Sequence, residues 1–80
     1  MNQADDTKKA SVGSWVKIQE HGLDEEEVFH LAQTTNALEN KVSPDDAMGQ
    51  ALLGARPGDT VTVQGPVGPI EFSVVDVGDD

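Results

Sequence analysis

The stretch that decides the fold of this 80-residue chain is 60-TVTVQGPVGPIEFSV-74. Apolar and polar residues alternate on both sides of its Gly-Pro-Val-Gly segment, with the period of two that is typical of half-buried strands. The glycines permit the positive φ values that a tight connection needs. The stretch therefore predicts a hairpin of two antiparallel strands. Val74 and Val75 are adjacent and Val77 continues the phase of Val75, which predicts a bulge near these residues.

The same alternation predicts a second hairpin nearer the N-terminus. Val16 and Ile18 share one face of a strand over residues 14–20, and the alternation resumes over residues 27–33. The intervening His-Gly-Leu-Asp segment has the composition of a turn. We therefore expect these two strands to pair with each other.

One short helix is expected between the hairpins, at about residues 46–53. Met48, Ala51 and Leu52 have the i, i+3, i+4 spacing of a single helical face. Acidic residues at the helix start suit the positive end of the helix dipole and can cap its free N–H groups, and Gly54 suits a left-handed stop.

The order of these elements predicts the fold class α+β, with a curved antiparallel sheet packed against one short helix. Met48, Leu52 and Leu53 are expected to pack from the helix onto the sheet. The predicted core is formed by Val16, Ile18, Phe29, Leu31, Leu52, Val61, Val63, Ile70, Phe72 and Val74.

Composition limits the function. Fifteen Asp and Glu against five Lys and Arg give a net charge of −10, which argues against direct nucleic-acid binding by phosphate neutralisation. No cysteine is present, which excludes thiolate metal sites and a cysteine nucleophile. A chain this short is expected to form one small monomeric domain, burying only about 60% of the surface of the unfolded chain.

The ends of the chain are polar and carry no periodic pattern. We expect a flexible tail over residues 1–11, a folded body over residues 12–77 and a frayed end over residues 78–80. No apolar run approaches the roughly 18 residues of a membrane span, and no signal-peptide pattern opens the sequence, so a cytoplasmic location is expected.

Several short motifs stand in a recognisable order and spacing: Val12-Gly13-Ser14, the acidic run Asp24-Glu25-Glu26-Glu27, Ala51-Leu52-Leu53-Gly54, Gly58-Asp59 and the closing hairpin of residues 65–77. Together they resemble the C-terminal domain of the GreA/GreB transcript cleavage factors over residues 12–77. The resemblance implies an FKBP-like fold and RNA polymerase as partner. In that family a helical coiled coil with an acidic tip precedes this domain and holds the catalytic Mg²⁺. A chain of this length is not expected to supply it, so we expect a non-catalytic module that needs no metal or cofactor.

The resemblance also implies a docking loop. The family reads Asp-Ser-Pro and then an apolar residue at the helix start, and alignment through the Ala-Leu-Leu-Gly segment places Asp45, Asp46, Ala47 and Met48 there. The family's Asp is kept, while Asp46 replaces Ser, Ala47 replaces Pro and Gln50 replaces a basic residue. The resemblance therefore implies that these five residues bind a protein partner, RNA polymerase near its secondary channel.

Other conspicuous residues have simpler interpretations. The acidic run of residues 24–27 lacks calcium-loop spacing and is interpreted as a solvated turn. His21 and His30 have no partner at ligand spacing and are interpreted as surface or hairpin-stabilising residues. Trp15 lies on the polar-phase face of its strand, where it either covers an edge of the core or forms an exposed binding patch.

Two alternative functions stay open. An acidic adaptor for an unrelated basic partner would also use a charge of −10, although a high-salt cytoplasm would select the same acidity. An FKBP-like prolyl isomerase would need an aromatic pocket, for which Trp15, Phe29 and Phe72 are the available residues. The sequence also leaves open whether the chain is a whole protein or an excised domain.

Overall fold

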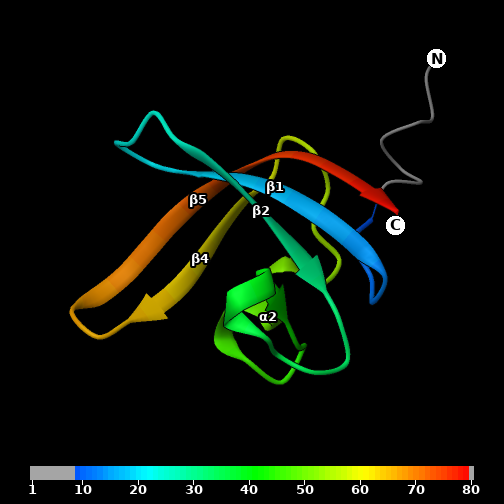
Figure 1. The fold of residues 1–80 in the computed structure, drawn as a ribbon. Helices are drawn as coiled ribbons and strands as arrows, with labels where there is room; N and C mark the ends of the chain where they lie inside the picture. The colour runs from blue at the N-terminus through cyan, green and yellow to red at the C-terminus, as the bar shows by residue number, and fades with distance from the viewer. Residues whose placement is uncertain (1–8, 80) are drawn as a thin grey trace, which may run out of the picture.

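The computed structural model describes residues 9–79 and shows one sheet curled around a short helix (Figure 1). The elements follow in the order β1 (Ser14–Glu20), β2 (Glu26–Leu31), the 3-10 helix η1 (Ala37–Glu39), β3 (Lys41–Val42), α2 (Ala47–Leu52), β4 (Thr60–Gly65) and β5 (Gly68–Asp79). The sheet order is β3-β2-β1-β5-β4. The α+β class is confirmed, with α2 on one face of the sheet. No helix of the described residues is long and apolar enough to cross a bilayer.

Both predicted hairpins are confirmed. β1 pairs antiparallel with β2, and β4 pairs antiparallel with β5. The long strand β5 also pairs with β1, which joins the two hairpins into one sheet. Lys17 lies opposite Asp76 and Ile18 lies opposite Val74, so Val75 is the extra residue of a bulge, where the sequence predicts one.

One part of the sheet differs from the prediction of a purely antiparallel arrangement. β3 pairs parallel with β2, through His30 opposite Lys41 and Leu31 opposite Val42, so the sheet is mixed. The connection contains η1, which ends at Asn40 with a left-handed φ of 55°. A two-residue strand has too few residues to show alternation, which is why the pattern does not reveal β3.

The core lies between α2 and the face of the sheet that carries Val16 and Ile18. Of the ten predicted core residues, six are buried and four are partly buried against them; the four are Phe29, Val61, Val63 and Ile70. The core also contains Ala10, Val42, Ala55 and Val77, which the prediction omitted. Leu53, expected on the sheet, is instead 48% exposed because the helix ends at Leu52 and the chain turns outward there.

Both boundaries of the folded body extend further than expected. Ala10, assigned to the flexible tail, is 2% exposed, donates its N–H to the Ala55 carbonyl and accepts from the Gly54 N–H. Gly78 and Asp79, assigned to a frayed end, continue β5 and pair with β1. Residues 1–8 and residue 80 lie outside the described residues.

Candidate protein-binding site

Ser43 organises the loop that leads into α2. Its backbone N–H donates to Thr35 Oγ1 at 3.0 Å, and its own Oγ accepts from the Asp45 N–H at 3.1 Å. Its carbonyl accepts from the Asp46 N–H at 2.9 Å. Ser43 is buried whereas its partners are exposed, so these bonds are partly shielded from water and fix the loop conformation. The predicted docking residues therefore sit on an ordered turn.

Asp46 occupies the N-cap position of α2 but does not cap it in the expected way. Its carbonyl accepts from the Gln50 N–H at 2.8 Å and so begins the helical bonding. Its side chain makes no capping bond to a helix N–H and accepts instead from the Thr35 hydroxyl. The prediction of carboxylate capping is wrong for this residue, because the carboxylate ties α2 to the β2–β3 connection. The predicted left-handed stop is confirmed at Gly54, whose φ is 82°.

Gly49 allows α2 to lie directly against the loop. A Cβ built on Gly49 would lie 1.8 Å from the Ser43 carbonyl oxygen and 3.0 Å from the Pro44 nitrogen. No side chain fits in that space. The close approach of two backbone segments therefore depends on this one glycine.

The five predicted docking residues divide into two groups. Asp45, Asp46, Ala47 and Gln50 are exposed, whereas Met48 is partly buried and packs against the core. In the described part of the chain the Asp45 carboxylate makes no hydrogen bond or ion pair, so it is available to a partner. The structure thus presents two adjacent carboxylates on a fixed turn, with Met48 holding the turn to the core.

A groove of about 300 Å³ runs beside the docking loop, between α2 and β4. Among residues 9–79, no charged side chain contributes to its walls. They are formed by Ala47, Gln50 and Ala51 from α2 and by Thr62, Val63 and Gln64 from β4.

His21 joins the β1–β2 turn to β5. Its Nε2 lies 2.9 Å from Ser73 Oγ and its Nδ1 lies 3.4 Å from Glu71 Oε1. The three side chains are exposed or half-exposed on the surface of the sheet, where water competes for these contacts. The arrangement supports the interpretation of His21 as a hairpin-stabilising residue.

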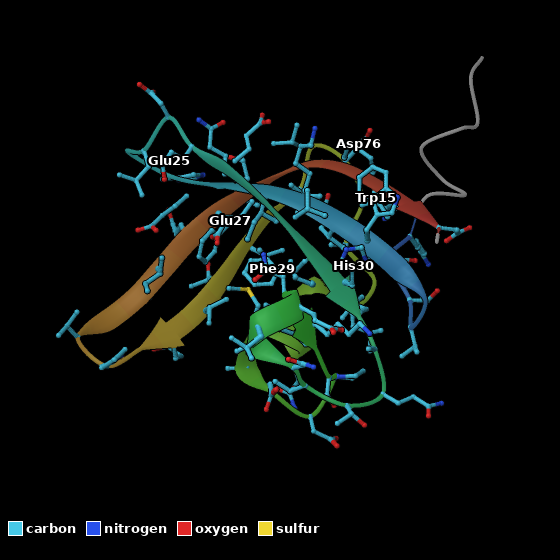
Figure 2. All side chains as sticks on the ribbon, in the orientation of Figure 1. Trp15, Glu25, Glu27, Phe29, His30 and Asp76 are labelled. Carbon is cyan, nitrogen blue, oxygen red and sulfur yellow. The ribbon has the colours of Figure 1, made fainter. Side chains whose placement is uncertain are left out.

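The acidic run of residues 24–27 lies at the far end of the β1–β2 hairpin, as the position of Glu25 in Figure 2 shows. All four side chains are exposed, and Lys17 Nζ lies 3.9 Å from Glu26 Oε1. Among residues 9–79 no group of three or more His, Asp or Glu side chains is placed to hold a metal ion.

Trp15 lies on the face of the sheet opposite α2, beside its cross-strand neighbour His30 (Figure 2). Its ring packs flat on Gly78: a Cβ on Gly78 would lie 2.4 Å from the Trp15 Cζ2 atom. Trp15 is half-buried by this contact, so it covers the outer side of the β1–β5 pair and is not part of the core.

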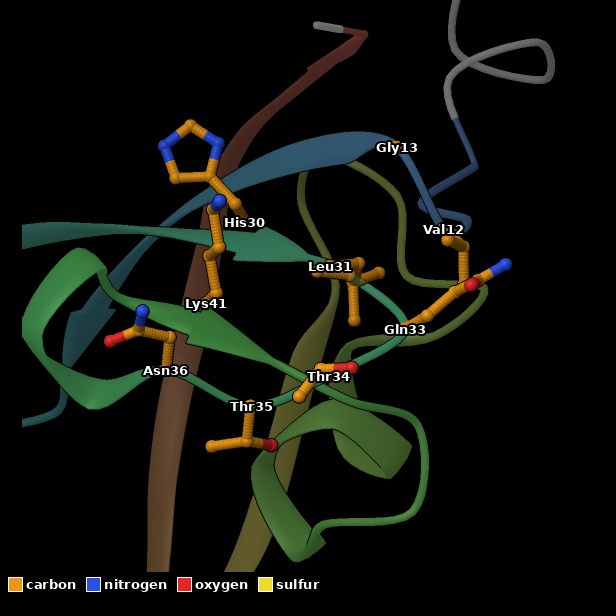
Figure 3. A pocket seen from close by; sticks show the side chains of 10 residues that line it. Val12, Gly13, His30, Leu31, Gln33, Thr34, Thr35, Asn36 and Lys41 are labelled. Carbon is orange, nitrogen blue, oxygen red and sulfur yellow. The ribbon is translucent and has the colours of Figure 1, made fainter.

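A larger hollow, of about 570 Å³, has a different lining from the predicted docking residues (Figure 3). Its walls are formed by the residues just before β1, the end of β2, the β2–β3 connection and the start of β3. Their side chains include His30, Lys41 and Asn36. Lys41 Nζ lies 3.0 Å from Glu39 Oε1, so its charge is already partnered. Thr35 also lines this hollow, on the side that faces the docking loop.

The sequence prediction missed three residues that shape the docking loop: Thr35, Ser43 and Gly49. Ser43 stands in a Ser-Pro-Asp segment, a composition that favours a side-chain-stabilised turn. Gly49 is an isolated glycine inside a helical pattern, which often marks close packing. Thr35 gives no local signal, because its partners lie eight and eleven residues away.

The curled mixed sheet, the short helix α2 and the exposed acidic turn before it define a small α+β domain. Residues 4–79 match the family described as "Transcription elongation factor, GreA/GreB, C-term". The chain belongs to this family of GreA/GreB C-terminal domains.

Individual relatives agree with this assignment. The chain is 39% identical over 71 residues to transcription elongation factor GreA of Streptococcus pneumoniae serotype 19F (strain G54), which covers 86% of this chain and 44% of that protein. The crystal structure of Thermus aquaticus Gfh1 superposes with a TM-score of 0.79 at 32% identity, covering 89% of this chain and 48% of the other. A further structure of the transcription factor Gfh1 gives a TM-score of 0.81 at 28% identity, covering 96% and 51%. The chain thus spans about half the length of the relatives it matches.

Proposed function

We propose that this domain binds RNA polymerase near its secondary channel through the loop and start of α2, and that it modulates transcription elongation in the cytoplasm without catalysing a reaction. The proposed contact residues are Asp45, Asp46, Ala47, Met48 and Gln50. The family assignment supports a role in transcription elongation. The observation that carries the proposal is the exposed Asp45 carboxylate on a turn fixed by Ser43.

A fixed turn lowers the cost of binding. Flexible loops lose conformational entropy when they bind, whereas the hydrogen bonds of Ser43 already hold the backbone of Asp45 and Asp46 in place. The net charge of −10 also steers a cationic partner surface toward the domain. We infer that the turn contacts a basic surface of the polymerase.

The test is the substitution Asp45→Asn, with Glu25→Gln as a control that removes the same charge at the distant hairpin tip. Because Asp45 makes no side-chain bond in the described part of the chain, its replacement is expected to leave stability unchanged. Binding to purified RNA polymerase is expected to weaken by about 0.5–3 kcal/mol, and by more at low salt than at high salt. Glu25→Gln is expected to bind like the wild type.

The outcomes separate the candidate functions. Equal affinity of the wild type and Asp45→Asn at two salt concentrations removes this loop from the proposed interface. No measurable binding by any of the three proteins supports the alternative of an acidic adaptor for another basic partner, which rests on the same net charge.

The prolyl isomerase alternative is disfavoured by the position of the aromatic residues. Phe29 and Phe72 face α2 from one side of the sheet, and Trp15 lies on the other side. A pocket that desolvates a twisted imide needs its aromatic walls on one side.

A further inference from the structure

The two edges of the sheet are protected to different degrees. One edge strand, β3, spans two residues and begins with Lys41. The other, β4, spans six residues with the sequence TVTVQG and carries no charge, proline or bulge. Natural proteins usually protect edge strands with those features, because the unpaired backbone groups of an edge can pair with another chain. Within residues 9–79, β4 itself carries none of these protecting features.

The register shows which backbone groups of β4 are unpaired by β5. The Val74 N–H donates to the Asp59 carbonyl, so Asp59 is at a bonded position. Bonded and non-bonded positions alternate along an antiparallel pair. The backbone N–H and C=O groups of Thr60, Thr62 and Gln64 therefore point away from β5. Gln64 lies opposite Pro69, which has no N–H to donate. This agrees with the register, because a residue at a non-bonded position donates no hydrogen bond to the partner strand.

This edge opens into the groove between α2 and β4. Thr62 and Gln64 line the groove together with Ala47 and Ala51 of α2. The side chains of Thr62 and Gln64 alternate with Val63, which packs against the core that α2 covers, so they stand on the opposite face of the sheet. Thr62 and Gln64 therefore border the groove along the edge of β4, and not from the face that packs against α2. The groove therefore has an uncharged helix as one wall and an open strand edge as the other.

We propose that this groove binds an extended cationic peptide segment of a partner protein, which adds to β4 as a sixth strand. Strand addition obtains affinity from main-chain hydrogen bonds and specificity from alternate side chains that enter the groove. The groove shares Ala47 and Gln50 with the loop proposed to bind polymerase, but the backbone edge of β4 lies outside that loop, and this proposal does not rest on the function proposed for the loop.

The acidic side chains near β4 favour a cationic peptide over a second copy of this domain at the β4 edge. Asp46 directly precedes α2, Asp59 directly precedes β4, and Glu71 lies opposite Thr62. A second copy of this domain carries the same net charge of −10, so two copies repel each other. A peptide with lysines at its ends would be attracted by the same groups.

The first test uses a fluorescently labelled peptide, Lys-Val-Thr-Val-Thr-Val-Lys, and a matched peptide with glutamate in place of both lysines. The lysine peptide is expected to bind more tightly, with a difference that shrinks as salt is added. Thr62→Pro removes an outward N–H without removing a bond to β5, so it is expected to fold and to bind about tenfold more weakly. Thr62→Val keeps the N–H and is expected to bind like the wild type.

Amide hydrogen exchange provides a second test that requires no variant. In the free protein the amides of Thr60, Thr62 and Gln64 are expected to exchange faster than those of Val61 and Val63. Addition of the lysine peptide is expected to protect the first group. Protection confined to residues 45–50, no binding of the lysine peptide, equal binding of the glutamate peptide, or dimerisation of the free protein through β4 would overturn the proposal. Asp45→Asn is expected to bind the peptide normally, which separates this site from the polymerase-binding loop.

Discussion

Replacing Gly49 by alanine is expected to destabilise the domain, although the same change usually stabilises a helix. At an unstrained helical position, Gly→Ala raises stability by about 0.4–1 kcal/mol, because it reduces the freedom of the unfolded chain. At Gly49 the new Cβ would lie 1.8 Å from the Ser43 carbonyl oxygen and 2.4 Å from its carbon. Both are backbone atoms, so a side-chain rotation cannot relieve the contact.

The structure sets the size of the effect. Relieving the contact requires α2 or the loop to move by more than 1 Å, since real Cβ atoms essentially never come within 3.0 Å of such neighbours. Overpacking of this kind costs about 1–3 kcal/mol, which exceeds the gain from helix propensity. A domain of this size has a total stability of about 4–12 kcal/mol, so the loss is a large fraction. Because the Ser43 carbonyl also accepts from the Asp46 N–H, the movement is expected to weaken the proposed binding to RNA polymerase as well.

Urea denaturation followed by the fluorescence of Trp15, the single tryptophan, measures the change. The urea concentration at the midpoint is expected to fall for Gly49→Ala. For Gln50→Ala, the exposed neighbour on the same helix, the free energy of unfolding is expected to stay within about 0.5 kcal/mol of the wild-type value. A Gly49→Ala protein as stable as the wild type would show that the helix does not lie directly on the loop. The account of the loop as a fixed turn would then be wrong.

Three further substitutions test other contacts. Gly78→Ala is expected to displace the ring of Trp15, which packs directly on Gly78, and to shift its emission to longer wavelength while far-ultraviolet circular dichroism stays unchanged. Thr35→Val leaves the Ser43 N–H without its partner and is expected to cost about 1–2 kcal/mol in urea denaturation, whereas Thr35→Ser is expected to restore most of the loss. Ala10→Asp places a charge at a buried position and is expected to cost more than about 2 kcal/mol; a smaller loss would show that the chain before β1 does not pack on the core.

Alternation and helical spacing predicted most of the fold because they are local. β1 begins and ends where the pattern places it, the bulge falls at Val75, and α2 lies within one residue of the expected bounds at each end. The parallel strand β3 was missed because two residues carry no period. Ala10 was missed because a single alanine in a polar segment gives no sign that it will be buried, and its burial depends on the backbone of residues 54 and 55.

The docking loop shows why site residues are harder to predict than strands. The positions of Asp45 and Asp46 follow from alignment, but the conformation that presents them depends on three separated parts of the chain. The Thr35 hydroxyl comes from the β2–β3 connection, Ser43 from the end of β3 and Gly49 from inside α2. Each hydrogen bond alone contributes about 1 kcal/mol, but together with the close approach at Gly49 these bonds fix one backbone path. If the loop binds a partner as proposed, its binding depends on residues outside the proposed contact set, so replacing Thr35 or Gly49 is expected to weaken that binding although Asp45 is unchanged.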